Sequence, residues 1–333
     1  MSDRPTNPAP RWRGFNLLEM FTHESKGDWR EEDFAWMAEW GFDFVRLPTC
    51  YRLWSEPEDA LNMDEAGLEK VDRGVELGRK HGLHVSLNFH RAPGYCINPG
   101  IGEPFSLWKD DEALDVFCFQ WEAFARRYRG ISGRELSFDL VNEPPAVSDE
   151  VMTRADHERV IRSTVGAIRE IDPDRPITID GTSAGNEPSP ELGDLGVTQS
   201  CRAYLPMTVS HHKANWVRSE GWPEPQWPGL DHRGKICDRS ALEAHYARWA
   251  ELFEQGVGVH CGEGGCFNRT PHEVFLRWFR DVLEILTSLG IGHALWNLRG
   301  SFGVLDSGRS DVEYEDFHGH ALDRRLLELL REF

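Results

Sequence analysis

Short apolar runs alternate with longer amphipathic segments along most of this 333-residue chain. The runs are mostly continuous, without the polar–apolar alternation of a half-exposed strand, and this is typical of parallel strands buried on both faces. We predict eight strands, at Gly14–Met20, Phe42–Pro48, His84–His90, Leu136–Glu143, Pro176–Gly181, Met207–His212, Val257–Glu263 and His293–Leu298.

Helical periodicity fills the segments between these runs. In Pro271–Leu289 the apolar residues form one stripe, a proline opens the first turn and Gly290 follows the end, as expected of a helix. Other helices are predicted at Trp29–Trp40, Asp64–His81, Asp111–Arg129, Asp156–Ile171, Ser240–Gln255 and Asp316–Leu330, with a short turn at Pro188–Leu195. Eight strand–helix repeats without a linker predict a single (β/α)8 TIM barrel over residues 1–333.

Two long loops follow the third and sixth predicted strands, at Arg91–Asp110 and Lys213–Arg239. Loops after barrel strands lie on the C-terminal face, where barrel enzymes keep their active sites. The second loop carries Trp216, Trp222 and Trp227. Their rings suit either stacking on a sugar or packing that rigidifies the loop, and both interpretations stay open.

Charge and composition exclude several classes of partner. The net charge of −19 opposes binding to nucleic acid or to an anionic membrane, and no apolar stretch approaches the roughly 20 residues of a membrane span. The first residues lack the apolar core of a secretory signal, so we expect a cytoplasmic protein, or a secreted one if a signal was removed. The oligomeric state is left open.

The cysteines predict neither a metal site nor a disulfide framework. The chain has seven of them, an odd number, with no C-x-x-C pair and no matching histidine cluster. We expect free thiols and no bound metal.

Glu143 and Glu263 each end a predicted strand, the fourth and the seventh. Either residue alone is consistent with an exposed charge, but the pair suits one pocket approached from two strands. Hydrolysis of a glycosidic bond with retained configuration needs two carboxyl groups about 5–5.5 Å apart, one to protonate the leaving oxygen and one to attack the sugar. The pair therefore predicts a retaining glycosidase.

The tripeptide Asn142-Glu143-Pro144 at the end of the fourth strand gives this chain a family resemblance. From Gly14-Phe-Asn16 to Phe302-Gly303 the chain resembles glycoside hydrolase family 5, whose members are retaining enzymes on (β/α)8 barrels. The resemblance implies that Glu143 is the general acid/base, that Glu263 is the nucleophile and that Asn142 holds the sugar 2-hydroxyl.

Three further residues take roles from the resemblance. Arg46 would brace the nucleophile, His90 would lie in the site, and Trp296 would form the floor beneath the reacting sugar. Each also has a structural interpretation: Arg46 as the partner of any acid, His90 as a core histidine, and Trp296 as core packing.

The sixth predicted strand departs from the family pattern. The family has His-x-Tyr there, with a tyrosine hydroxyl on the nucleophile, whereas this chain reads Ser210-His-His-Lys-Ala-Asn215. His211 and His212 are alternatives for the histidine, with His211 favoured. The tyrosine's role is vacant, or is filled by His212 or another residue.

The function expected from the sequence is hydrolysis of β-1,4-glucan or short β-gluco-oligosaccharides, with an oligosaccharide or polysaccharide as partner and no cofactor. A β-mannosidase or mannanase is one alternative on the same scaffold. An exo-β-glucanase is another, because His90-Arg-Ala-Pro-Gly94 is similar to a stretch in exo-acting β-glucanases of the family. A catalytically silent carbohydrate-binding barrel is the alternative that is not an enzyme.

Overall fold

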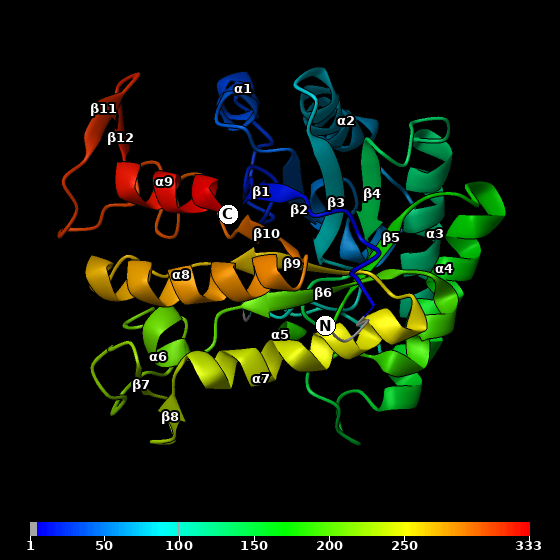
Figure 1. The fold of residues 1–333 in the computed structure, drawn as a ribbon. Helices are drawn as coiled ribbons and strands as arrows, with labels where there is room; N and C mark the ends of the chain where they lie inside the picture. The colour runs from blue at the N-terminus through cyan, green and yellow to red at the C-terminus, as the bar shows by residue number, and fades with distance from the viewer. Residues whose placement is uncertain (1–4, 99) are drawn as a thin grey trace. The chain divides into compact units, whose positions relative to one another are not determined.

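The predicted barrel is confirmed in the computed structural model, which describes residues 5–98 and 100–333. Over these residues eight parallel strands close in the order β1-β10-β9-β6-β5-β4-β3-β2 (Figure 1). The barrel strands are β1 (Arg13–Asn16), β2 (Phe44–Cys50), β3 (His84–Arg91), β4 (Leu136–Asp139), β5 (Ile177–Asp180), β6 (Thr198–Ala203), β9 (Val259–Gly264) and β10 (Gly292–Leu295).

Helices follow the strands, as the periodicity predicted. Side-chain caps fix several starts: Thr153 and Asp156 form a capping box at one helix, and Asp238 caps another, each satisfying free N–H groups of a first turn. The helices are α1 (Glu31–Glu39), α2 (Glu65–Lys80), α3 (Asp111–Arg127), α4 (Arg154–Ile171), α5 (Thr182–Gly185), α6 (Met207–Ser210), α7 (Arg239–Ala250), α8 (His272–Ser288) and α9 (Arg324–Glu332). Shorter 3-10 turns are η1 (Tyr51–Leu53), η2 (Pro57–Asp59), η3 (Pro190–Leu195) and η4 (Glu251–Gln255).

Contacts group the chain into two compact units, one of residues 1–16, 40–42 and 201–333, the other of residues 17–39 and 43–200. We call them the C-terminal unit and the N-terminal unit. Aromatic rings pack together in the core of each. In the N-terminal unit the rings of Phe89 and Trp121 stack with centroids 4.2 Å apart. In the C-terminal unit Trp278 and Phe279 of α8 stack at 5.5 Å, and such pairs add to the gain from burial alone.

The prediction of the sixth strand at Met207–His212 is wrong. Met207–Ser210 forms α6, and β6 lies earlier, at Thr198–Ala203. Its polar residues Gln199 and Arg202 are buried; the Gln199 amide, for example, exchanges hydrogen bonds of 2.9 and 2.7 Å with the backbone of Ser189. A strand whose buried residues are polar gives no apolar run, so hydrophobicity alone chose the wrong segment.

The last predicted helix begins later than expected. Its first half, after Asp316, instead belongs to a hairpin of β11 (Glu315–Phe317) and β12 (His320–Leu322), whose turn residues His318 and Gly319 have φ of 53° and 83°. Two positive φ values at a two-residue turn match the twist of a hairpin. Helix α9 starts after Asp323, whose carboxylate accepts from the Leu326 N–H at 3.0 Å.

The long connection after β6 also contains structure. It starts at Tyr204 and includes α6 and a hairpin of β7 (Gly229–Leu230) and β8 (Ile236–Cys237). None of the helices in residues 5–98 and 100–333 is long and apolar enough to span a bilayer.

Candidate active site

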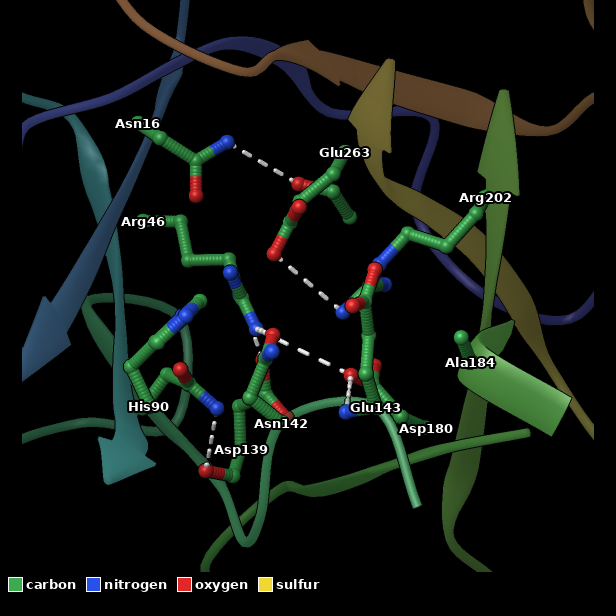
Figure 2. Close-up of polar contacts among 12 residues, drawn as sticks. Asn16, Arg46, His90, Asp139, Asn142, Glu143, Asp180, Ala184, Arg202 and Glu263 are labelled. Atoms are coloured by element: carbon green, nitrogen blue, oxygen red, sulfur yellow. Dashed lines mark hydrogen bonds and ion pairs between the residues drawn. The ribbon is translucent and has the colours of Figure 1, made fainter. Parts of the chain in front are cut away.

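A buried arginine organises the strand ends of the N-terminal unit. Arg46 on β2 donates from Nε to Asp139 Oδ2 at 2.7 Å and from Nη2 to Asn142 Oδ1 at 2.9 Å, and its Nη2 lies 3.8 Å from Asp180 Oδ2 (Figure 2). All four residues are at most 1% exposed. A buried arginine needs such partners, because an unpaired charge there is costly, and the result is a rigid polar network across β2, β4 and β5.

His90, the last histidine of β3, is also buried. Its Nε2 lies 2.8 Å from Asn98 Oδ1, and its ring meets Phe21 edge-on at 4.4 Å. Asn98 belongs to the loop after β3, residues 92–110, so this loop orients the histidine.

Glu103 anchors the same loop. Glu103 accepts from the Tyr51 hydroxyl at 2.6 Å, from Arg52 at 3.1 Å and from Arg91 at 2.7 Å. Its side chain is 7% exposed. Three donors on one carboxylate fix the loop after β3 against the end of β2.

Glu143 lies four residues beyond the end of β4, in an unusual backbone conformation. Its φ is 48°, in the left-handed region that residues other than glycine rarely adopt. Its N–H donates to Asp180 Oδ2 at 2.8 Å, and its C=O accepts from the Tyr95 hydroxyl at 2.6 Å. Both backbone polar groups of this residue are therefore held by side chains.

Glu263 lies within β9 of the C-terminal unit and is 3% exposed. Its Oε1 is 3.3 Å from Arg202 Nη2, and its Oε2 accepts from the Tyr204 hydroxyl at 3.0 Å (Figure 2 shows the arginine contact). The tyrosine role, which the sequence left vacant or filled by His212 or another residue, is thus filled by another residue, Tyr204, which directly follows β6. Tyr204 was not named from the sequence because the sixth strand was placed too late in the chain.

The two candidate histidines occupy different surroundings. His211 ends α6, meets the Tyr204 ring edge-on at 5.0 Å and has Nδ1 2.8 Å from Ser210 Oγ. Burial lowers the pKa of His211 to about 4, so its imidazole is neutral at pH 7. His212 Nε2 lies 3.6 Å from the carboxylate of exposed Glu224, and burial lowers the pKa of His212 also. Of the two, His211 contacts the tyrosine on Glu263.

The predicted tryptophans differ in exposure. Trp227 is a packing residue, because it is 5% exposed and its indole N–H donates to Asp281 Oδ2 at 2.8 Å. Trp216 is 48% exposed and rests edge-on against Phe267 at 5.1 Å. Trp222 lies by His232, with ring centroids 5.8 Å apart. Trp296 directly follows β10, and its backbone N–H donates to the Gly264 carbonyl at 2.7 Å. Trp216 therefore has a supported ring with an open side, as a stacking platform requires.

Sequence reasoning missed several residues of these clusters. Asp180 had a visible signal, because it is an acid that ends a short apolar run, whereas Asp139 lies inside the run that ends at Glu143. Arg202 and Tyr204 were missed because the sixth strand was misplaced.

Asn16 was visible in the sequence only as part of the motif Gly14-Phe-Asn16. Its amide donates to the carbonyls of Gly262 and Leu295, both at 3.0 Å, and so holds the ends of β9 and β10 beside Glu263.

Comparison with known proteins gives the family of the chain. Residues 3–301 match the family described as Cellulase (glycosyl hydrolase family 5). The chain belongs to glycoside hydrolase family 5. A cellodextrinase A of Ruminococcus flavefaciens is 30% identical over 79% of this chain and 76% of its own length. An endoglucanase C of Acetivibrio thermocellus is 28% identical over 86% of this chain and 88% of its own.

A solved structure of a glycoside hydrolase is similar over most of its length. It is 43% identical, covers 97% of this family 5 chain and 99% of its own, and superposes with a TM-score of 0.92. The predicted fold and the predicted class of enzyme, a retaining β-glycosidase, are confirmed by the family. The alternative of a catalytically silent carbohydrate-binding barrel is therefore not supported.

Proposed function

We propose that this family 5 enzyme cleaves β-1,4-glucosidic bonds, with Glu263 as nucleophile and Glu143 as general acid/base. The relatives named cellodextrinase and endoglucanase support the glucan. In a closed parallel barrel the C-terminal strand ends share one face; Glu143 follows β4 and Glu263 lies on β9. We expect their carboxyl groups about 5–5.5 Å apart, the separation of retaining enzymes.

The reaction proceeds in two displacements. Glu263 attacks the anomeric carbon, the bond from that carbon to the leaving oxygen breaks, and Glu143 gives its proton to that oxygen. Glu143, now a carboxylate, then takes a proton from water as the water oxygen attacks the same carbon and Glu263 departs. The two inversions give net retention, and Glu143 ends protonated as it began.

The environment of Glu263 is the observation that carries the proposal. A nucleophilic carboxylate must present one oxygen at a fixed place, and here Arg202 and Tyr204, two positions apart, each hold one oxygen. Asn16 fixes the strand ends on either side. This is the preorganisation that a covalent step needs.

The remaining predicted residues have supporting roles in the proposal. Asn142, whose amide oxygen accepts from Arg46, is oriented by that bond and would present its amide nitrogen to the sugar 2-hydroxyl. Arg46 would brace the nucleophile through the polar network. His90, His211, His212 and the rings of Trp296, Trp216 and Trp222 would line the sugar subsites.

Trapping the glycosyl-enzyme tests the proposal. A 2-deoxy-2-fluoro-β-cellobioside with a dinitrophenyl leaving group should inactivate the enzyme, because the fluorine slows the second step more than the activated first step. Mass spectrometry should then place one fluorocellobiosyl group on the peptide that contains Glu263. A Glu263→Gln variant should stay unlabelled. A label on another carboxylate, or no label with full turnover, would remove the nucleophile from Glu263.

The substrate class is tested separately with matched oligosaccharides. Cellotetraose should be cleaved with a higher kcat/KM than β-1,4-mannotetraose, and product lengths would show whether attack is internal or at chain ends. A preference for mannotetraose would favour the mannanase alternative without changing the catalytic roles.

A further inference from the structure

The left-handed backbone of Glu143 does not stand alone. Glu143, Ser183 and Ala184 have φ of 48°, 56° and 55°, and they belong to two segments that bind each other. The Ser183 N–H donates to the Pro145 carbonyl at 3.2 Å, and the Ala184 N–H donates to the Pro144 carbonyl at 2.9 Å. Such strained residues persist only where surrounding contacts hold them, and they gather at functional sites.

The turn that supplies these two N–H groups is rigid. Its Asn186 amide donates to the carbonyl of Ser183 at 2.7 Å, and the N–H groups of Gly185 and Glu187 bond back to Gly181 and Thr182 at 2.9 and 3.0 Å. Prolines at 144 and 145 have no N–H, so this segment offers its partners only carbonyl groups. Two left-handed residues in the turn are what aim two successive N–H groups at those carbonyls.

Glu143 itself is held from both sides. Asp180, the last residue of β5, accepts its N–H at 2.8 Å, while Tyr95 donates its hydroxyl to its C=O at 2.6 Å. Tyr95 is placed by two backbone hydrogen bonds with Ala92 and by an edge-on contact with Trp108 at 5.0 Å. Burial, and then the negative charge of Glu143, raise the pKa of Tyr95, so the hydroxyl keeps its proton and remains a donor.

We propose that Tyr95 and Asp180 are positioning residues that hold Glu143 in its left-handed conformation and thereby aim its carboxyl at the leaving oxygen. The backbone angles set the direction of the Cα–Cβ bond, so relaxation toward right-handed φ would swing the carboxyl away. This inference rests on the proposed role of Glu143 as acid/base. A displacement of about 1 Å costs on the order of 100-fold in rate.

The test compares two aryl β-cellobiosides whose leaving groups differ in their need for protonation by a general acid. The phenolate of phenyl β-cellobioside is a poor leaving group and needs a proton from Glu143. The dinitrophenolate of 2,4-dinitrophenyl β-cellobioside leaves without one. The value of kcat/KM reports the first displacement for both. Tyr95→Phe keeps the ring and removes the hydroxyl, so kcat/KM should fall about 10- to 100-fold for the phenyl substrate and within about 2-fold for the dinitrophenyl substrate.

Two other variants calibrate this split. Glu143→Ala should lose about 10²- to 10⁴-fold on the phenyl substrate, the usual worth of general acid catalysis, and far less on the dinitrophenyl one. Tyr128→Phe is the matched control. Tyr128 directly follows α3, and its hydroxyl donates to Asp72 at 2.9 Å. Its loss should leave kcat/KM unchanged for both substrates. Asp180→Ala removes the acceptor of the Glu143 N–H and should lose more on the phenyl substrate than on the dinitrophenyl one. Because Asp180 also lies 3.8 Å from Arg46, a smaller loss on both substrates is expected as well.

The outcomes separate the inference from the proposed function. With the thermal midpoint preserved, equal losses on both substrates, or no loss on either, in Tyr95→Phe would overturn the positioning role of Tyr95. The same result in Asp180→Ala would overturn that of Asp180. If Glu143→Ala showed no dependence on the leaving group, Glu143 would not be the acid, and the proposed function would fail instead.

Discussion

The two proposed catalytic glutamates differ in where their partners bind, one at its side chain and the other at its backbone. Glu263 lies in a regular strand, and the contacts of Arg202 and Tyr204 are made to its carboxylate oxygens. Glu143 lies beyond a strand in a left-handed conformation, and the contacts of Asp180 and Tyr95 are made to its backbone. A nucleophile needs charged partners at its oxygens, whereas an acid/base that gains and loses a proton each cycle is better aimed through its backbone.

This contrast has a kinetic consequence. Loss of a partner of Glu263 should slow the first displacement whatever the leaving group, because attack is always required. Loss of a partner of Glu143 should matter only where the leaving group needs a proton.

Arg202→Met should cause the largest loss among the supporting residues. It leaves the buried carboxylate of Glu263 without its cation, and breaking a buried ion pair costs about 3–5 kcal/mol. We expect kcat/KM to fall about 10²- to 10⁴-fold on both phenyl and dinitrophenyl β-cellobioside.

Arg175→Met is the matched control. Arg175 is equally buried, but it binds Asp172 and the carbonyls of Leu136 and Tyr128, so its loss should lower the thermal midpoint and spare the kcat/KM of the folded enzyme. Similar kinetic losses in both variants would mean that Arg202 serves only the fold.

Tyr204→Phe should lose less than Arg202→Met. A hydrogen bond to a charged group is worth about 1.5–3 kcal/mol, so kcat/KM should fall about 10- to 100-fold. The loss should be the same for both leaving groups, unlike that of Tyr95→Phe. A loss confined to the phenyl substrate would break the contrast between the two glutamates.

The protein should become less stable on acidification because of His157, which packs against Trp108, the ring that contacts Tyr95. His157 is fully buried, tilts against Trp108 at 6.0 Å, and has no hydrogen-bond partner for either ring nitrogen among the described residues. Burial lowers its pKa to about 4, below the unfolded value near 6.5. The unfolded chain therefore binds the proton first, and stability is lost as pH falls from about 6.5 toward 4.

At pH 5 this loss should amount to about 2 kcal/mol relative to pH 8. A His157→Leu variant should lack it, so its free energy of unfolding, measured by urea at the two pH values, should change less than that of the parent. Replacement of exposed His23 serves as the control. An unchanged pH dependence in His157→Leu would remove His157 as the cause.

The smallest effect is expected at the outer platforms. Trp216→Ala and Trp222→Ala should each cost on the order of 1 kcal/mol, about 5-fold in kcat/KM, on cellotetraose or cellopentaose. An aryl glycoside should lose less, because it never reaches these rings. Equal losses on short and long substrates would place the rings at the reacting sugar.

The sequence predicted the barrel well because seven of its strands are short apolar runs between glycines, prolines and caps. The sixth strand could not be found in this way. Its buried residues Gln199, Ser200 and Arg202 are polar, whereas the following Met207–Ser210 is more apolar and folds as a helix. Composition reports burial only where the buried residues are apolar.

The site was predicted in proportion to how local its signals are. Asn142-Glu143-Pro144 is a contiguous motif, and Glu263 ends an apolar run, so both glutamates could be named. Tyr95 could not, because its importance comes from one hydrogen bond to a residue 48 positions away. The left-handed φ of Glu143 is equally invisible, since glutamate has no preference for that region.

The anomeric configuration of azide products tests the central assignment most directly. With 2,4-dinitrophenyl β-cellobioside and sodium azide, Glu263→Ala should yield the α-cellobiosyl azide, because the anion attacks from the space that the nucleophile vacated. Glu143→Ala should yield the β-azide, because Glu263 still forms the glycosyl-enzyme and azide replaces water in the second step. Proton NMR of the anomeric centre distinguishes the two products. The opposite pairing, β from Glu263→Ala and α from Glu143→Ala, would show that the two roles are reversed.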